Sequence, residues 1–187
     1  MAARKVTATI ALKPGLEAPV LAGPNLLAVN NAESGEIDLI DLAAGKPAGV
    51  IAMPGCQHPT GLDYAPDQHL ALSACGNGVA ALVDLAQRRL VTLLPIGEGP
   101  DTVIWQAARQ RFLVPCGRSG TLSIISLNGQ RARVETPVAT EMSARTAALD
   151  PISGEVFLPA ARFQTGTTEH RPPIVPGSVH LLVLAPS

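Results

Sequence analysis

Aromatic residues, net charge and long apolar runs are all scarce in this chain of 187 residues. Phe, Trp and Tyr supply 3% of it, so aliphatic side chains must fill most of the core of a single domain. A net charge of −1 and the lack of basic runs argue against nucleic acid as a partner. No apolar stretch approaches the roughly 18 residues of a membrane-spanning helix, so we expect no membrane span.

Known catalytic signatures and targeting signals are missing as well. The chain has no nucleophile elbow, phosphate-binding loop, HExxH motif or kinase signature. Residues 1–20 do not read as a signal peptide, because Pro14, Gly15 and Glu17 interrupt the apolar segment too early. Helical periodicity of useful length is also absent, which leaves strands as the expected elements.

What the chain does contain is one pattern in four copies. In each copy a glycine opens a strand, and apolar residues follow at the second, fourth, fifth and seventh positions. The glycines are Gly35, Gly78, Gly120 and Gly177, and the first two steps are 43 and 42 residues. A period of about 40–45 residues built from short strands is typical of propeller blades.

Shorter apolar runs and turn residues surround each glycine strand, so each copy is predicted to be a four-stranded antiparallel meander. We therefore predict an all-β chain, a β-propeller of four four-stranded antiparallel blades in one domain that covers residues 1–187. The expected blades are residues 13–54, 55–97, 98–138 and 139–187.

The two ends of the chain look complementary. The last copy stops at Leu184 without a fourth strand, whereas the chain begins with a strand-like segment, Lys5–Leu12, that resembles Arg89–Ile96. We predict that this segment is the outer strand of the last blade, beside Ser178–Leu184, and closes the ring. The alternative is a part of a larger ring that needs partner blades. A chain that closes its own ring is expected to be a monomer. A homodimer implies a ring of eight blades shared by two chains.

Several segments resemble a known family. Leu27-Ala28-Val29-Asn30-Asn31 followed by Gly35–Asp41 is similar to the YVTN repeat of YncE-like β-propellers, as are residues 55–62, 95–101 and 144–151. Members of that family usually have about seven blades, so the resemblance implies the C-terminal portion of such a protein. The resemblance also suggests a periplasmic or secreted location, since members of the family often carry an export signal. If the resemblance does not extend to location, we expect a cytoplasmic protein. The resemblance implies an architecture and no particular chemistry.

Four residues that begin the inner strands should ring the mouth of the central channel: Glu17, Thr60, Asp101 and Arg145. Two acids, a hydroxyl and a guanidinium on one axis are suited to orienting a small polar ligand, or to holding a cation such as Ca²⁺ on the acidic side. In the alternative interpretation, Asp101 and Arg145 only hydrogen-bond the backbone of neighbouring loops.

Further candidates lie on the loops at the same end of the blades: Asn30, His58, Asn77, Arg118 and Arg162. Asparagine in tight turns also has a purely conformational explanation, because it tolerates positive φ. The loop Ala161–Pro176 is far longer than hairpin connections usually are, which is typical of functional or disordered segments. It is a candidate for contact with a partner or ligand.

The three cysteines should all lie at this end. Cys56 and Cys75 belong to one blade and are the most plausible disulfide, which would leave Cys116 free. Inert thiols in a reducing compartment are the second alternative. A metal site with His58 is the third, although no CxxC spacing supports it.

These features favour a non-catalytic binding or scaffold propeller that uses the loop face for a small ligand or a protein partner. We assign no catalytic residue, metal or cofactor. One enzymatic alternative is a metal-dependent hydrolase of lactonase type, with Glu17, Asn30, Asn77 and Asp101 around calcium; Arg145 would oppose such a cation. The other is a quinoprotein dehydrogenase-like subunit, which rests on analogy of fold alone.

Overall fold

The computed structural model describes residues 5–164 and 172–186, and this part of the chain is built from antiparallel strands. Its one helical element is a single 3₁₀ turn, Ala107–Arg109. None of the described helices is long and apolar enough to cross a membrane. The all-β fold class predicted from the repeats is confirmed.

The strands form four antiparallel sheets in chain order, which we call blades 1 to 4. Blade 1 consists of β1 (Leu16–Leu21), β2 (Leu26–Asn31), β3 (Glu36–Asp41) and β4 (Lys46–Ala52). Blade 2 consists of β5 (Pro59–Ala65), β6 (Leu70–Cys75), β7 (Val79–Asp84) and β8 (Arg89–Pro95).

Blade 3 has an additional short outer strand, and blade 4 has only three strands in the described residues. Blade 3 consists of β9 (Ile104–Gln106), β10 (Arg111–Cys116), β11 (Thr121–Asn128), β12 (Arg131–Val134) and β13 (Val138–Ala139). Blade 4 consists of β14 (Ala148–Leu149), β15 (Val156–Ala160) and β16 (His180–Leu184).

The repeated glycine has a conformational role. Gly35, Gly78, Gly120 and Gly177 have φ values of 66°, 79°, 61° and 73°. Glycine adopts this left-handed region without the steric cost that a side chain adds. Each glycine therefore ends the turn that reverses the chain before the third strand of its blade, which explains why the pattern keeps a glycine there.

Apolar side chains fill the space between consecutive blades. Ile37 and Leu39 of blade 1 pack with Ala71 and Val83 of blade 2 in one cluster of buried residues. A second cluster joins blades 2 and 3, and a third joins blades 3 and 4. Successive residues of a strand point to opposite faces, so each inner blade contributes to two clusters. The core is thus a series of sandwiched layers, as expected for a propeller.

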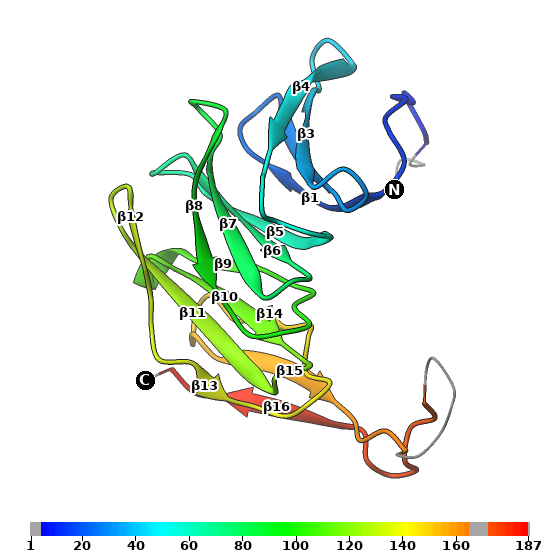
Figure 1. Ribbon diagram of the computed structural model, residues 1–187, viewed down its shortest axis with the longest axis vertical. Helices are drawn as coiled ribbons and strands as arrows, with labels where there is room; N and C mark the ends of the chain where they lie inside the picture. Colours follow the sequence, from blue (N-terminus) through cyan, green and yellow to red (C-terminus); the bar gives the residue numbers. More distant parts are fainter. Residues whose placement is uncertain (1–4, 165–171, 187) are drawn as a thin grey trace.

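The predicted closure of the ring is wrong. Residues 5–12 form no strand, and β16 pairs only with β15 among the described residues. The blades follow one another in an arc, with the N-terminal segment beside blade 1 and blade 4 at the other end (Figure 1). Leu12 and Lys13 instead line a cavity with Asp38 of blade 1. The arc of four blades leaves blade 4 away from this segment, and the end of the segment lies against blade 1.

Candidate functional site on the loop face

The candidate residues belong to one end of the blades, which we call the loop face. It is formed by the turns that join the second and third strands of each blade, such as residues 76–78 and 117–120. The connections from one blade to the next, such as residues 53–58 and 96–103, lie at the same end. Loops that extend from a rigid scaffold are a common location for binding residues.

Asp101 and Arg145 form an ion pair between blades 3 and 4. The distance from Arg145 Nε to Asp101 Oδ2 is 3.3 Å. Both groups remain open to solvent, with 67% of the Arg145 side chain and 35% of the Asp101 side chain exposed. An exposed pair of this kind contributes about 0–1 kcal/mol to stability. The contact therefore places two opposite charges at the surface at little energetic gain for the fold.

The loop that carries Arg145 is held firmly by its neighbours. Ser143 has a φ of 82°, a strained value for a residue with a side chain. Its backbone N–H donates to the carbonyl of Gly117, and its hydroxyl donates to the carbonyl of Ala161 at 2.8 Å. Ala144, which follows it, is fully buried. These contacts fix the start of the segment from which the Arg145 side chain extends.

Arg118 lies on the turn beside this segment. A Cβ added at Gly117 would be 2.7 Å from the Cβ of Arg145, so the two loops touch. The backbone N–H of Arg118 donates to the Glu98 carbonyl, which fixes the turn. The side chain is exposed, and within the described part of the chain its guanidinium has no hydrogen bond or ion pair. A second cation is therefore free near the Asp101–Arg145 pair.

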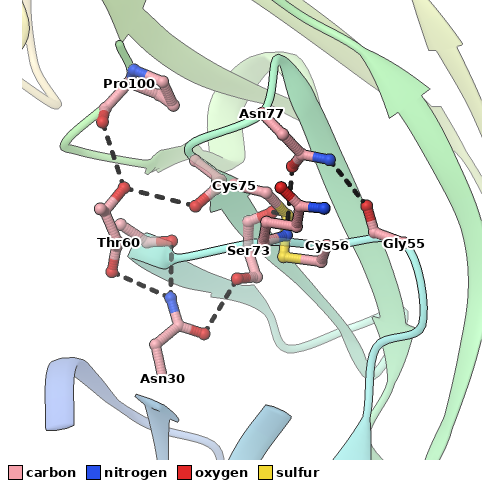
Figure 2. The surroundings of a disulfide bond; sticks show 11 residues. Asn30, Gly55, Cys56, Thr60, Ser73, Cys75, Asn77 and Pro100 are labelled. Atoms are coloured by element: carbon pink, nitrogen blue, oxygen red, sulfur yellow. Dashed lines mark hydrogen bonds between the residues drawn. A yellow bond between two sulfur atoms is a disulfide. The ribbon is translucent and has the colours of Figure 1, made fainter. Parts of the chain in front are cut away.

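Thr60 is used within the fold. Its hydroxyl lies 3.2 Å from the Pro100 carbonyl and 3.3 Å from the Ala74 carbonyl, so it can donate to either one (Figure 2). The bond to Pro100 links blade 2 to the residue that precedes Asp101. Thr60 therefore helps to position the loop of Asp101, and its hydroxyl is already engaged.

Glu17 is separate from this group. It is exposed on β1, and in the described residues no hydrogen bond or ion pair joins it to Thr60, Asp101 or Arg145. Thr60 is therefore joined to the loop of Asp101, and Asp101 to Arg145, whereas Glu17 on blade 1 makes no contact with them among the described residues.

The expectation that Asn30 lies on the loop face is wrong. Asn30 is fully buried at the end of β2. Its amide nitrogen donates to the carbonyls of Thr60 at 2.9 Å and Gly61 at 3.0 Å, and its amide oxygen accepts from the Ser73 hydroxyl (Figure 2). Asn30 therefore joins blade 1 to blade 2 and has no free group for a ligand. The signal that sequence reasoning passed over was a pair of polar residues, Asn30 and Asn31, that directly follows an apolar run within the same strand.

Asn77 and the disulfide candidates hold one corner of blade 2. The Cys56–Cys75 disulfide is present, as the sequence analysis favoured. Asn77 Nδ2 donates to the Gly55 carbonyl at 3.0 Å, and its Oδ1 accepts from the Gln57 backbone N–H at 3.1 Å (Figure 2). The amide thus ties the β6–β7 turn to the blade 1–blade 2 connection on either side of Cys56.

Cys116 is a free, buried thiol. Burial raises the pKa of this thiol above its ordinary value, against the opposing effect of hydrogen bonds with Ser123 and with the backbone of Gly97. A thiol with a raised pKa is a poor nucleophile and a poor metal ligand at neutral pH. Cys116 is therefore suited to packing.

His58 and Arg162 stay near the loop face without a shared contact. His58 is exposed in a left-handed conformation, with φ 49°. The Arg162 backbone N–H donates to the Ser178 hydroxyl. The long loop Ala161–Pro176 is described only at its two sides, where Phe163 and Ile174 form an isolated bridge. Residues 165–171, on which part of the prediction rests, lie outside the described residues.

The donor set for calcium does not assemble. Asn30 and Asn77 use both ends of their amides in the contacts given above. No group of three His, Cys, Asp or Glu side chains suited to a metal ion occurs in residues 5–164 and 172–186. The Arg145 guanidinium beside Asp101 also opposes a cation there.

Sequence reasoning also missed a second polar contact between blades. Asp63 on β5 accepts from the Trp105 backbone N–H at 2.6 Å, which links blade 2 to blade 3. Burial raises the pKa of Asp63, although hydrogen bonds from the backbone of Trp105 and Tyr64 act in the opposite direction. Asp63 lines a cavity of about 600 Å³ together with Tyr64 and His69. This cavity opens beside the β5–β6 turn and includes none of the residues predicted for a ligand.

No protein-family model matches the sequence, and no curated protein matches it. Solved structures do resemble the fold. Hydrazine synthase from Kuenenia stuttgartiensis matches with a TM-score of 0.71 and 14% identity over 97% of this chain and 53% of its own. A functionally unknown protein from Desulfotomaculum acetoxidans matches with a TM-score of 0.69 and 12% identity over 94% of this chain and 63% of its own.

A putative 6-phosphogluconolactonase from Bacteroides fragilis matches with a TM-score of 0.60 and 15% identity over 70% of this chain and 41% of its own. These neighbours are propeller-like proteins, and this chain has the same kind of fold. At such low identity the likeness concerns the fold alone. The chain spans between about two fifths and two thirds of the length of these three structures.

Proposed function

We propose that this chain is a non-catalytic β-propeller binding or scaffold protein of the YncE-like, YVTN-repeat type. Its loop face takes a small ligand or a protein partner that carries an anionic group. The observation that supports this most is the exposed Asp101–Arg145 ion pair between blades 3 and 4.

Two properties of this pair favour recognition. It contributes little to stability at its exposure, so a ligand can replace one partner at small cost to the fold. It also presents a planar guanidinium, which binds carboxylate and phosphate oxygens in a bidentate manner. An anionic group of the ligand therefore meets Arg145, and a cationic group meets Asp101.

Arg118 strengthens the preference for an anion. Its guanidinium is exposed on the turn that touches the Arg145 loop. The two arginines offer guanidinium groups on this face, which also carries Asp101 and the exposed Glu98, whose backbone carbonyl accepts from the Arg118 N–H. Arg118 and Arg145 are thus the residues expected to contribute most to affinity, whereas Thr60 acts by holding the Asp101 loop.

The test is an NMR titration of the ¹⁵N-labelled chain with inorganic phosphate and, separately, with triglycine, a zwitterion that offers a carboxylate and an amine. We expect the largest shifts at Gly99, Gly117 and Arg145. Arg145→Gln and Arg118→Gln should each weaken binding several-fold, with a melting temperature close to that of the parent. Arg131→Gln is the matched control, because Arg131 is exposed at the opposite end of blade 3.

If both arginine variants bind as the parent does but melt earlier, the residues only hold loops and the ligand site lies elsewhere. The lactonase alternative has its own readout. Hydrolysis of 6-phosphogluconolactone above the spontaneous rate, abolished by Asp101→Ala, would contradict a non-catalytic role.

A further inference from the structure

The blades of this chain share one rule of packing. In blades 1 to 3, the residues two and four positions after the repeated glycine point toward the following blade. In blade 2 these residues are Ala80 and Leu82, both 0% exposed and packed in the cluster with blade 3. In blade 3 they are Leu122 and Ile124, 3% and 7% exposed in the cluster with blade 4.

Blade 4 breaks the rule. Its equivalent residues, Val179 and Leu181, are 67% and 55% exposed. Val183, two positions further along β16, is 53% exposed and pairs across the sheet with Phe157. We call these four side chains the terminal face. Their positions are those at which the earlier blades bury apolar residues against the next blade, so the terminal face has the composition of an interface and has no partner within the described chain.

The edge of blade 4 is unpaired as well. In blades 1 to 3 the third strand pairs with an outer strand, as β3 does with β4 and β7 with β8. The third strand of blade 4, β16, pairs only with β15 in the described residues. A free edge next to an exposed apolar face is a site to which another strand readily adds.

The N-terminal part of the chain has a segment that could pair with the free edge of β16 and a blade that could cover the terminal face. Lys5–Leu12 places Val6, Ala8, Ile10 and Leu12 at alternate positions, the pattern of a strand, yet it forms no strand and leaves Val6 85% exposed. In the repeat, the strand that comes before the first strand of a blade is the outer strand of the blade before it, as β4 comes before β5. Lys5–Leu12 comes before β1 and therefore has the position of an outer strand. Among the described residues no other blade packs on the face of blade 1 that carries Asp38, and the segment that lies there is Ala11–Lys13.

We propose that a second copy of this chain covers the terminal face, with its blade 1 packed on blade 4 and its residues Lys5–Leu12 paired with the free edge of β16. The contact joins blade 4 of one copy to blade 1 and Lys5–Leu12 of the other. Each copy has both surfaces, so a pair of copies can form the contact twice. Such a head-to-tail contact closes into a ring when the rotation fits. The ring then has eight blades, within the range of about four to eight that propellers adopt.

The oligomeric state of the intact chain provides the first test. Light scattering from micromolar to near-millimolar concentration should give twice the mass of one chain. Leu181→Asp should convert this dimer to a monomer, because it places a charge in the apolar contact. Ile152→Asp is the matched control, since Ile152 is 95% exposed on a turn at the opposite end of blade 4. Removal of residues 1–12 should also weaken the dimer.

Hydrogen exchange of the parent provides a second test that needs no variant to fold. The alternate amides of residues 180–184 that point away from β15 should exchange slowly in the dimer and faster at dilutions where the monomer prevails. A parent chain that stays monomeric throughout overturns the proposal and leaves the terminal face to blades of another chain. The proposal is also overturned if the Leu181→Asp variant is still a dimer and the free-edge amides of β16 are unprotected in the parent dimer.

Discussion

The Ser73 hydroxyl donates a 2.9 Å hydrogen bond to Oδ1 of Asn30, and both residues are fully buried between blades 1 and 2. With the two bonds from Asn30 to the carbonyls of Thr60 and Gly61, it forms a buried polar contact between two blades whose interface is mainly apolar. Apolar packing alone tolerates sliding, whereas these bonds have defined directions. The contact therefore specifies how blade 1 sits on blade 2.

Asn30→Ala should destabilise the protein strongly, because Asn30 is buried and its side chain joins blade 1 to blade 2. It removes three hydrogen bonds and leaves buried partners unsatisfied, so we expect a loss of about 2–4 kcal/mol in the free energy of unfolding. Urea denaturation followed by circular dichroism measures this loss. Asn25→Ala, at an exposed turn of the same blade, is the control and should change stability by less than about 0.5 kcal/mol. Equal stability of the two variants would contradict the role of Asn30.

The disulfide gives a thiol count that can be measured directly. Protein from an oxidising compartment, unfolded without reductant, should show one free thiol, and three after reduction. Replacement of both Cys56 and Cys75 by alanine should cost about 3 kcal/mol, because the bridge closes a loop with a sequence separation of 19. The double variant should be insensitive to reductant, which serves as the control. Three free thiols in the unreduced protein would exclude the bridge.

Cys116 should resist alkylation in the folded protein. Burial raises the pKa of its thiol, and the reactive species is the thiolate, so both access and ionisation are reduced. Iodoacetamide at pH 8, followed by mass spectrometry, should modify Cys116 slowly in the native state and readily after unfolding in urea. Equal rates in the two states would show that the thiol is accessible.

His180 should titrate above the ordinary histidine value of about 6.5. Its Nδ1 donates to the Ser178 carbonyl at 2.7 Å, and its Nε2 lies 3.1 Å from Glu141 Oε1; the first contact and then the second raise the pKa of His180. Because the folded value is raised, any stabilisation from these contacts is present below about pH 6.5 and is lost as the pH rises through the folded value.

NMR titration of the imidazole signals measures this pKa. Glu141→Gln should lower it, since the anionic acceptor is removed while the Ser178 carbonyl remains. Glu33→Gln, on blade 1, is the control and should leave it unchanged. A His180 pKa that is the same in all three proteins would show that Glu141 has no influence on it.

Local pattern was enough to predict an all-β chain of successive antiparallel sheets, although blade 3 has five strands and blade 4 has three in the described residues. The glycine at each third strand, the alternation of apolar residues and the turn residues between runs are properties of short segments, and each blade depends mainly on them. The disulfide between Cys56 and Cys75, the favoured one of three alternatives that the sequence left open, likewise joins residues of one blade. These features were readable from the sequence because strands of one meander are close along the chain.

Relations between blades were decided by the tertiary structure. Whether Lys5–Leu12 meets β16 depends on the total rotation between the first blade and the last along the arc (Figure 1). A local sequence pattern does not specify this total rotation. The burial of Asn30 and the meeting of Asp101 with Arg145 depend on it too, since each involves side chains of two blades. The sequence by itself thus determined the repeated unit and its turns. The tertiary structure alone decided which polar side chains are buried between blades, which remain on the loop face, and which apolar face has no partner among the described residues.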